Sequence, residues 1–152
     1  MFRVAYNIPL IIRAPNRISP GLISDRYVSS MDLFSTILDN LGLIDKAMDE
    51  SIPSRSFLRL LDNPKDDWDD FVFFEQEESR AVRSPDWLYV KRFGRSEKYS
   101  LKNELYDLSS DPDERNNLSG KTDFLEIENS LSEKIDLYFK TYATSQFDLW
   151  KG

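Results

Sequence analysis

The sequence has 152 residues, of which 40% are apolar and 13% aromatic, which is enough for one compact domain with a core. A formal net charge of -7 argues against general binding to nucleic acids or anionic membranes, because phosphate contacts need a basic surface. Cysteine and histidine are both missing, which excludes disulfides, zinc–thiolate sites and the commonest general base near neutral pH.

The first predicted element is a strand at Ile8–Arg13. Its unbroken apolar run is typical of a strand that is buried on both faces of a sheet. Such a strand needs neighbours, which a position at the start of the chain does not supply.

A helix is predicted between Ser29 and Gly42. Ser29 and Asp32 fit a capping box, in which the serine oxygen accepts a backbone amide and the carboxylate accepts one in return. Gly42 falls where a left-handed C-terminal cap is expected. For Thr36 and Asp39, a solvated face and a hydrogen bond to the backbone are expected. The predicted apolar face comprises Leu33, Phe34, Ile37, Leu38 and Leu41.

An acidic loop is predicted next. Ser56–Leu61 indicates one or two helical turns, which end before Pro64, and residues 65–70 then place four aspartates around Trp68. Clustered aspartates can bind calcium, but the ligand spacing and glycine turn of an EF-hand loop are missing. We therefore predict a solvated acidic loop and no metal site in this chain.

The remaining elements predict an antiparallel sheet and a covering helix. Short aromatic and β-branched strands at 71–75, 87–93 and 105–108 are separated by turns. Within the second strand, Tyr89 should face away from Leu88 because side chains alternate. The helix at 123–142 should lie on the sheet through a stripe of Phe124, Ile127, Leu131, Ile135, Tyr138 and Tyr142.

In this order the segments resemble the C-terminal part of sulfatases of the alkaline phosphatase superfamily, including bacterial members and N-sulfoglucosamine sulfohydrolase. The resemblance covers nearly the whole chain. It departs from the family at Ser35, where proline is usual, and at Ser54, where glycine is usual. The matching stretches are IPLIIRAPNRISPG, VSSMDLFSTILDNLGL, RSFLRLL, FFEQEESRAVRSPDWLYVKRF, ELYDLSSDPDERNNLSG and QFDLWKG.

The resemblance implies an α+β chain that completes an alkaline-phosphatase-like α/β fold. Residues 1–64 would be the end of the α/β sulfatase domain, with its last core strand and an amphipathic helix. Residues 65–152 would be a C-terminal subdomain, in which a small antiparallel sheet is covered by a helix.

The resemblance also implies that the chemistry lies elsewhere. In complete family enzymes, a cysteine or serine of a C/S-x-P-x-R motif becomes formylglycine, and a calcium ion polarises the sulfate oxygens. We expect this motif and the calcium ligands to precede the present chain. No catalytic residue is therefore assigned, and the chain alone is predicted to be inactive.

Glu75, Arg80 and Arg83 are the candidate substrate-binding residues. The resemblance implies that a loop of this sheet brings a glutamate and an arginine towards the sugar, and Glu75 and Arg83 match that pair in spacing. Arg80 and Arg83 could hold anionic groups with the guanidinium fork. The alternative is a salt-bridged hairpin among Glu75, Glu77, Glu78, Arg80 and Arg83.

The resemblance implies hydrolysis of sulfate esters or sulfamates, on a sulfated carbohydrate or another small sulfate ester, together with an N-terminal catalytic domain. Sulfatases of this type are often exported, a habit of the family that these residues do not themselves indicate. Two other functions stay open: a non-catalytic interaction or glycan-binding domain, and a phosphodiesterase relative of the same superfamily.

Overall fold

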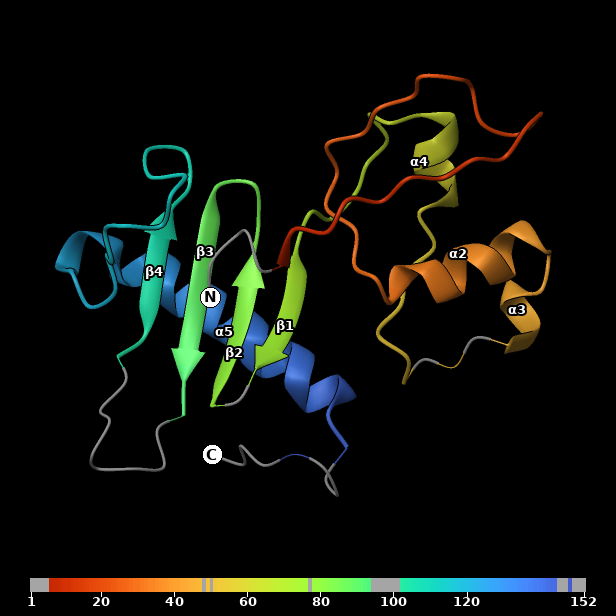
Figure 1. The fold of residues 1–152 in the computed structure, drawn as a ribbon. Helices are drawn as coiled ribbons and strands as arrows, with labels where there is room; N and C mark the ends of the chain where they lie inside the picture. Colours follow the sequence, from red (N-terminus) through yellow and green to blue (C-terminus); the bar gives the residue numbers. More distant parts are fainter. Residues whose placement is uncertain are drawn as a thin grey trace. The chain divides into compact units, whose positions relative to one another are not determined.

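A computed structural model describes residues 6–47, 49, 51–76, 78–93, 102–144 and 148. The chain divides into two compact units. We call Asn7–Asp70 the helical unit, and Phe71–Gly152 together with Met1–Tyr6 the sheet unit. Figure 1 shows the helices and strands of both units. Within the described ranges, no helix is long and apolar enough to cross a membrane.

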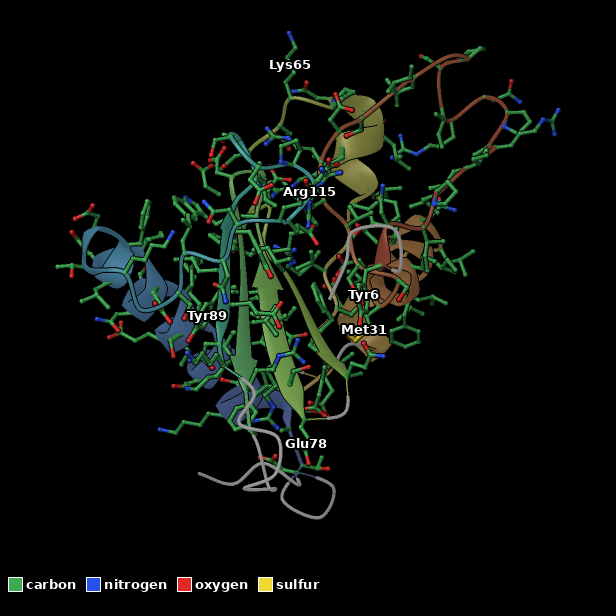
Figure 2. The ribbon with its side chains drawn as sticks, turned by 60° about the vertical axis from the view of Figure 1, so that its left-hand side comes forward. Tyr6, Met31, Lys65, Glu78, Tyr89 and Arg115 are labelled. Carbon is green, nitrogen blue, oxygen red and sulfur yellow. The ribbon has the colours of Figure 1, made fainter. Side chains whose placement is uncertain are left out.

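The sheet unit is built on four antiparallel strands, each paired with the next one along the chain (Figure 1). The predicted antiparallel sheet is therefore confirmed, with one strand more than the sequence indicated. Glu78 lies at the turn between the first two strands (Figure 2). The strands are β1 (Val72–Gln76), β2 (Ser79–Arg83), β3 (Trp87–Arg92) and β4 (Glu104–Asp107).

One face of the sheet is covered by helix α5 (Leu125–Tyr142), which follows the short 3-10 helix η1 (Thr122–Phe124) (Figure 1). The ring of Phe73 in β1 stacks on that of Tyr138 in α5, with 4.0 Å between the ring centroids. The predicted covering helix is thus confirmed. The buried core between sheet and helix comprises Val82, Tyr89, Leu105, Leu118, Leu131 and Ile135.

The opposite face of the sheet carries a second buried apolar cluster. Leu88 and Val90 belong to this cluster, whereas Tyr89 between them belongs to the core under α5. This alternation is the one predicted for β3, since successive side chains of a strand point to opposite faces. The cluster comprises Ala81, Leu88, Val90, Tyr106 and Leu108.

The helical unit contains α2 (Asp32–Asn40), α3 (Ile44–Ala47) and α4 (Leu58–Asp62). At the start of α2, the Asp32 carboxylate accepts the Ser29 amide at 2.8 Å, as a capping box requires. The Ser29 hydroxyl oxygen accepts the Met31 amide at 3.3 Å. Beyond the other end, Gly42 has φ +67°, the left-handed conformation expected there.

The orientation of α2 corrects the prediction from its apolar spacing. Its polar side faces the unit: Asp32 and Thr36 are buried, and they accept the backbone amides of Arg55 at 2.8 Å and Phe57 at 3.0 Å. Phe34, by contrast, is 48% exposed. The reason is that the amides of the 55–57 segment need acceptors, which only the polar side of α2 supplies. The predicted solvated position of Thr36 is therefore wrong, whereas the backbone hydrogen bond expected for it is present: its hydroxyl donates to the Asp32 carbonyl oxygen at 2.7 Å.

The predicted strand at Ile8–Arg13 is not formed. These residues have no regular secondary structure, and Ile8 and Ile11 are 77% and 91% exposed. The four strands of the described sheet pair only with one another. Without a neighbouring strand, the backbone groups of an apolar segment have no ladder to join.

Candidate functional site

The candidate substrate-binding residues lie on the β1–β2 hairpin. Arg80 stands directly opposite Glu75 in the strand register, and its Nε donates to Glu75 Oε2 at 2.6 Å. Its Nη2 donates to Asp148 Oδ1, also at 2.6 Å. The guanidinium carbon lies 4.2 Å from the ring centroid of Phe139 and 5.6 Å from that of Phe93. Arg80 is thus a buried cation with two carboxylates and two rings around it.

Arg83 has a different partner. Its Nη1 donates to Glu114 Oε1 at 2.8 Å, and the Glu114 side chain is only 2% exposed. Glu114 lies in the loop after β4 and has φ +58°, a backbone conformation that side-chain-bearing residues adopt infrequently. The ion pair therefore ties this loop to β2.

The structure does not bring Glu75 and Arg83 together. Arg80 and Arg83 are three residues apart on one strand, so their side chains leave opposite faces of the sheet. Glu75 pairs with Arg80, and Arg83 lies opposite Val72. Of the ion pairs expected within the hairpin, Glu75–Arg80 is present, whereas Arg83 pairs with Glu114 outside it. Substrate binding by these residues stays a prediction.

A polar cluster that the sequence analysis missed lies on β3 and β4. Arg92 binds the Glu104 carboxylate, and the Tyr106 hydroxyl donates to Glu104 Oε2 at 3.1 Å. Burial, followed by the negative charge of Glu104, raises the pKa of Tyr106 to about 12. Tyr106 therefore keeps its proton to a higher pH than an ordinary tyrosine does, and it donates this proton in a hydrogen bond to the Glu104 carboxylate. The sequence signal for this cluster was the spacing of Glu104 and Tyr106, which are two residues apart and so share one face of a strand.

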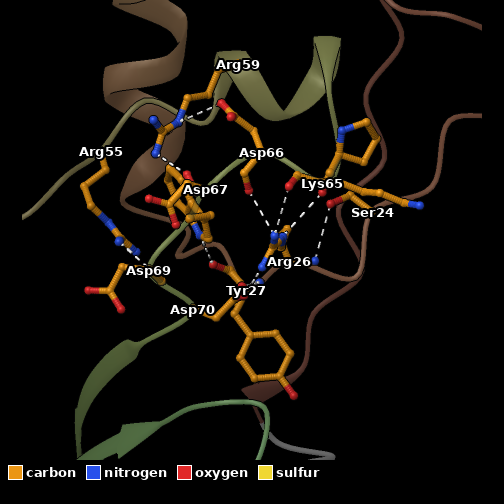
Figure 3. Close-up of polar contacts among 12 residues, drawn as sticks. Ser24, Arg26, Tyr27, Arg55, Arg59, Lys65, Asp66, Asp67, Asp69 and Asp70 are labelled. Carbon is orange, nitrogen blue, oxygen red and sulfur yellow. Dashed lines mark hydrogen bonds and ion pairs between the residues drawn. The ribbon is translucent and has the colours of Figure 1, made fainter.

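The Arg26 side chain holds the acidic loop of residues 65–70 through hydrogen bonds (Figure 3). Arg26 donates to Asp70 Oδ2 at 2.7 Å and to the Asp66 carbonyl at 2.9 Å. The backbone amide of Tyr27 donates to Asp70 Oδ1 at 2.8 Å, and the indole N–H of Trp68 donates to the Tyr27 carbonyl at 2.8 Å. The predicted fully solvated loop is therefore wrong at Asp70 and Trp68, whose contacts fix the loop to the preceding segment.

The described residues contain no group of three acidic, histidine or cysteine side chains that could share a metal ion. The guanidinium of Arg26 supplies the positive charge beside Asp70 instead. The calcium ion that the resemblance implies for complete sulfatases thus has no ligand set in the described ranges.

One segment, 51–55 (SIPSR), does fit the letters of the C/S-x-P-x-R motif, contrary to the expectation that no such motif lies here. Its contacts are structural. The Ser54 hydroxyl donates to the Met31 carbonyl at 2.7 Å, and the Arg55 guanidinium lies 4.3 Å from the ring centroid of Trp68. Ser51 lies in an exposed turn.

The four-stranded antiparallel sheet with a helix covering one face is an α+β architecture. Residues 1–140 match the family described as N-sulphoglucosamine sulphohydrolase, C-terminal. The chain belongs to this family.

Curated relatives are sulfatases. Arylsulfatase K from Mus musculus is 27% identical over 99% of this chain and 30% of its own length. N-acetylglucosamine-6-O-sulfatase from Bacteroides thetaiotaomicron is 25% identical over 100% of this chain and 29% of its own length. The present chain thus spans under a third of the length of both of these relatives.

Solved structures share the fold. One, a protein in complex with its substrate D-glucosamine-2-N,6-O-disulfate, has a TM-score of 0.75 at 23% identity, over 93% of this chain and 30% of its own. A phosphonate monoester hydrolase from Silicibacter pomeroyi has a TM-score of 0.68 at 19% identity, over 90% of this chain and 29% of its own. At these identities the likeness concerns the fold, which is that of the C-terminal region of alkaline-phosphatase-like enzymes.

Proposed function

We propose that this chain is the C-terminal part of a sulfatase that hydrolyses sulfate esters or sulfamates of carbohydrates. One observation carries the proposal: the chain matches a sulfohydrolase family over 1–140, and the matching family is the C-terminal region of those enzymes. The catalytic centre would lie in a part of the protein that precedes this region.

The ion pairs of the described residues support a catalytic centre that lies outside this region. The three arginines of the sheet, Arg80, Arg83 and Arg92, are each paired with carboxylates. Paired arginines attract a sulfate group less than unpaired ones do, because the carboxylates cancel their charge. In the complete enzyme, calcium would supply Lewis acidity and formylglycine the nucleophile. The chain itself would supply fold and pocket wall, and it would be inactive alone.

Glucosamine sulfates are the proposed substrate class. The proposal is supported by a relative named for 6-O-sulfated N-acetylglucosamine and by the fold neighbour bound to a disulfated glucosamine. Sugars of this class carry hydroxyl or amino donors as well as anionic groups, so a rim carboxylate suits them better than another cation would.

Among the three candidate residues, we propose Glu75 as the direct contact with the sugar. Its side chain is 40% exposed, whereas that of Arg80 is 8% exposed and that of Arg83 is 14% exposed. Arg80 would then act as a positioning residue, since it holds Glu75 Oε2. Arg83 keeps the predicted role of binding anionic groups only if it can leave Glu114.

In the complete enzyme, Glu75→Gln should raise KM for a glucosamine sulfate by about tenfold, because a charge-assisted hydrogen bond is lost. Glu133→Gln, at an exposed position of α5, is the matched control and should leave KM unchanged. Steady-state kinetics of sulfate release measures both variants. Equal effects at the two positions would remove Glu75 from the substrate site.

A second candidate function, hydrolysis of a phosphoester or phosphonate, is favoured by the shared fold of the phosphonate monoester hydrolase. A non-catalytic binding domain is the third. The coding sequence directly upstream of this chain is the first observation that distinguishes these candidate functions. An open frame that encodes a C/S-x-P-x-R motif with aspartate, asparagine and histidine ligands is expected, and a genuine start with no enzyme sequence ahead of it would contradict the proposal.

A further inference from the structure

The guanidinium of Arg80 is enclosed at the end of the sheet where β1 turns into β2. The ring of Phe139, in α5, lies 4.2 Å from the guanidinium carbon, and the Arg80 side chain is 8% exposed. Figure 1 shows the last turns of α5 beside this end of the sheet. A cation that is taken out of water needs opposite charge close by, because desolvation otherwise makes it costly. The charged partners of Arg80 therefore decide where its guanidinium lies.

Two carboxylates divide the guanidinium fork between them. Nε of Arg80 donates to Glu75 Oε2 at 2.6 Å, and Nη2 donates to Asp148 Oδ1 at 2.6 Å. An arginine with a single carboxylate partner commonly binds both of its oxygens through two parallel hydrogen bonds. Here Asp148 takes one arm of the fork, and Arg80 holds Glu75 by Oε2.

Asp148 reaches Arg80 from beyond the end of α5. Its backbone amide donates to the Thr144 carbonyl at 2.9 Å, and Thr144 lies two residues after Tyr142, the last residue of the helix. The Asp148 side chain is 17% exposed. Asp148 is thus tied to the end of α5 through its backbone and to β2 through its carboxylate.

The Glu75 carboxylate stays accessible in this arrangement, with a side-chain exposure of 40%. Two carboxylates and one guanidinium leave one net negative charge on the cluster. Asp148 can therefore balance the cation while Glu75 remains an acceptor for hydroxyl or amino groups. Without the Asp148 carboxylate, both arms of the Arg80 fork could close on Glu75. Such a bidentate pair would occupy the oxygens that a sugar needs.

We propose that Asp148 is a positioning residue of the sugar-binding site: it holds one arm of the Arg80 guanidinium away from Glu75 and so keeps Glu75 available to a sulfated glucosamine. Asp148 acts through Arg80 and does not itself contact the sugar. This inference rests on the proposed function, in which Glu75 contacts the sugar. It adds to the site a residue that lies 68 positions along the chain from Arg80.

Steady-state kinetics of the complete protein tests the proposal with two substrates, a glucosamine sulfate and an aryl sulfate that has no sugar. Asp148→Asn should raise KM for the glucosamine sulfate by about fivefold and change kcat by less than about twofold, because the contact with the sugar weakens while the reacting group is untouched. KM for the aryl sulfate should stay unchanged. Asp148→Glu keeps the carboxylate and should restore most of the loss.

Asp136→Asn is the matched control, because Asp136 is a carboxylate of α5 whose ion pair with Lys91 lies at the surface. It should alter KM for neither substrate. Asp148→Asn should also have no further effect on KM in a protein that already carries Glu75→Gln, because residues that act through one contact are not additive. Thermal denaturation of each variant checks that it is folded.

Three results would overturn the proposal. The first is an unchanged KM in Asp148→Asn, and the second is an additive effect in the double variant with Glu75→Gln. The third is an equal loss with both substrates, or an unfolded Asp148→Asn, either of which would make the role of Asp148 purely structural.

Calorimetric binding of the glucosamine sulfate to the same proteins distinguishes this inference from the proposed function. A protein that releases no sulfate, but binds the sugar less tightly after Asp148→Asn, would keep the role of Asp148 and contradict the proposed hydrolysis. An active sulfatase in which Asp148→Asn behaves as the native protein would do the reverse. A complete protein that neither binds nor hydrolyses the sugar would overturn both.

Discussion

Arg83 and Glu114 show how a single ion pair can hold the sheet unit together. The pair is enclosed, with side-chain exposures of 14% and 2%, and it joins β2 to a loop far along the chain. Removing one member of a buried pair leaves the other charge in a poorly solvated place, which costs more than the attraction alone.

Arg83→Ala should therefore lower the free energy of unfolding by about 3–5 kcal/mol. Arg115→Ala is the control, because Arg115 pairs with Asp113 at 80% and 66% exposure, and it should change stability by less than about 0.5 kcal/mol. Urea denaturation followed by circular dichroism measures both. Similar values for the two variants would show that the Arg83 pair adds nothing to the fold.

Tyr106 gives a prediction about alkaline pH. Its pKa is raised to about 12 by burial and by Glu104, whereas an ordinary tyrosine titrates near 10. The folded state keeps the proton to higher pH than the unfolded state does. The contribution of Tyr106 to the free energy of unfolding is therefore complete below about pH 10 and is lost as the pH rises towards 12.

Tyr106→Phe should remove that contribution. Between about pH 9 and pH 11.5, the difference in unfolding free energy between the native chain and the variant should shrink steadily as the pH rises. Urea denaturation at several pH values measures it. A difference that stays constant over this range would contradict the raised pKa.

Among the elements, α5 depends on a clamp from the loop before it. The Glu128 carboxylate accepts the Ser119 hydroxyl at 2.7 Å and the Gly120 amide at 2.8 Å, and Glu128 is buried. Hydrogen bonds to a charged group are stronger than neutral ones, and here they fix the loop where α5 begins.

Glu128→Ala should cost about 2–3 kcal/mol, because it leaves two donors without their acceptor. Glu126→Ala is the matched control: Glu126 lies in the same first turn and has the same interaction with the helix dipole, but it is exposed. Thermal or urea denaturation compares them. An equal loss in both variants would attribute the effect to helix charge rather than to the clamp.

The elements also show what the sequence could predict. Helix α5 was foreseen because its stripe repeats at helical spacing and packs, through Leu131 and Ile135, on one sheet face. Strand β2 was missed because Ser79, Arg80 and Arg83 look polar, although the first two are buried. Arg80 and Arg83 bind carboxylates distant in sequence, Asp148 and Glu114 respectively, which no local pattern reveals.

For helix α2, the predicted position was right but the predicted buried face was wrong. The position and the left-handed end at Gly42 followed from local signals, but the choice of the buried face did not. A helix buries the side that its neighbours complement. Within this unit, α2 meets backbone amides through Asp32 and Thr36, and it meets the apolar cluster of Phe57, Leu60 and Trp68 through Leu33.

At the scale of the whole molecule, the chain combines two units with different requirements. The sheet unit buries its apolar residues on both faces of the sheet, whereas the helical unit presents much of its apolar surface outwards.

The most direct test of this account is sulfate release from a glucosamine sulfate, measured with the isolated chain and with the complete protein that the gene encodes. The account predicts turnover by the complete protein and none by the isolated 152 residues, which contain no histidine or cysteine. Turnover by the isolated chain, or a complete protein that releases no sulfate from any carbohydrate sulfate, would contradict it.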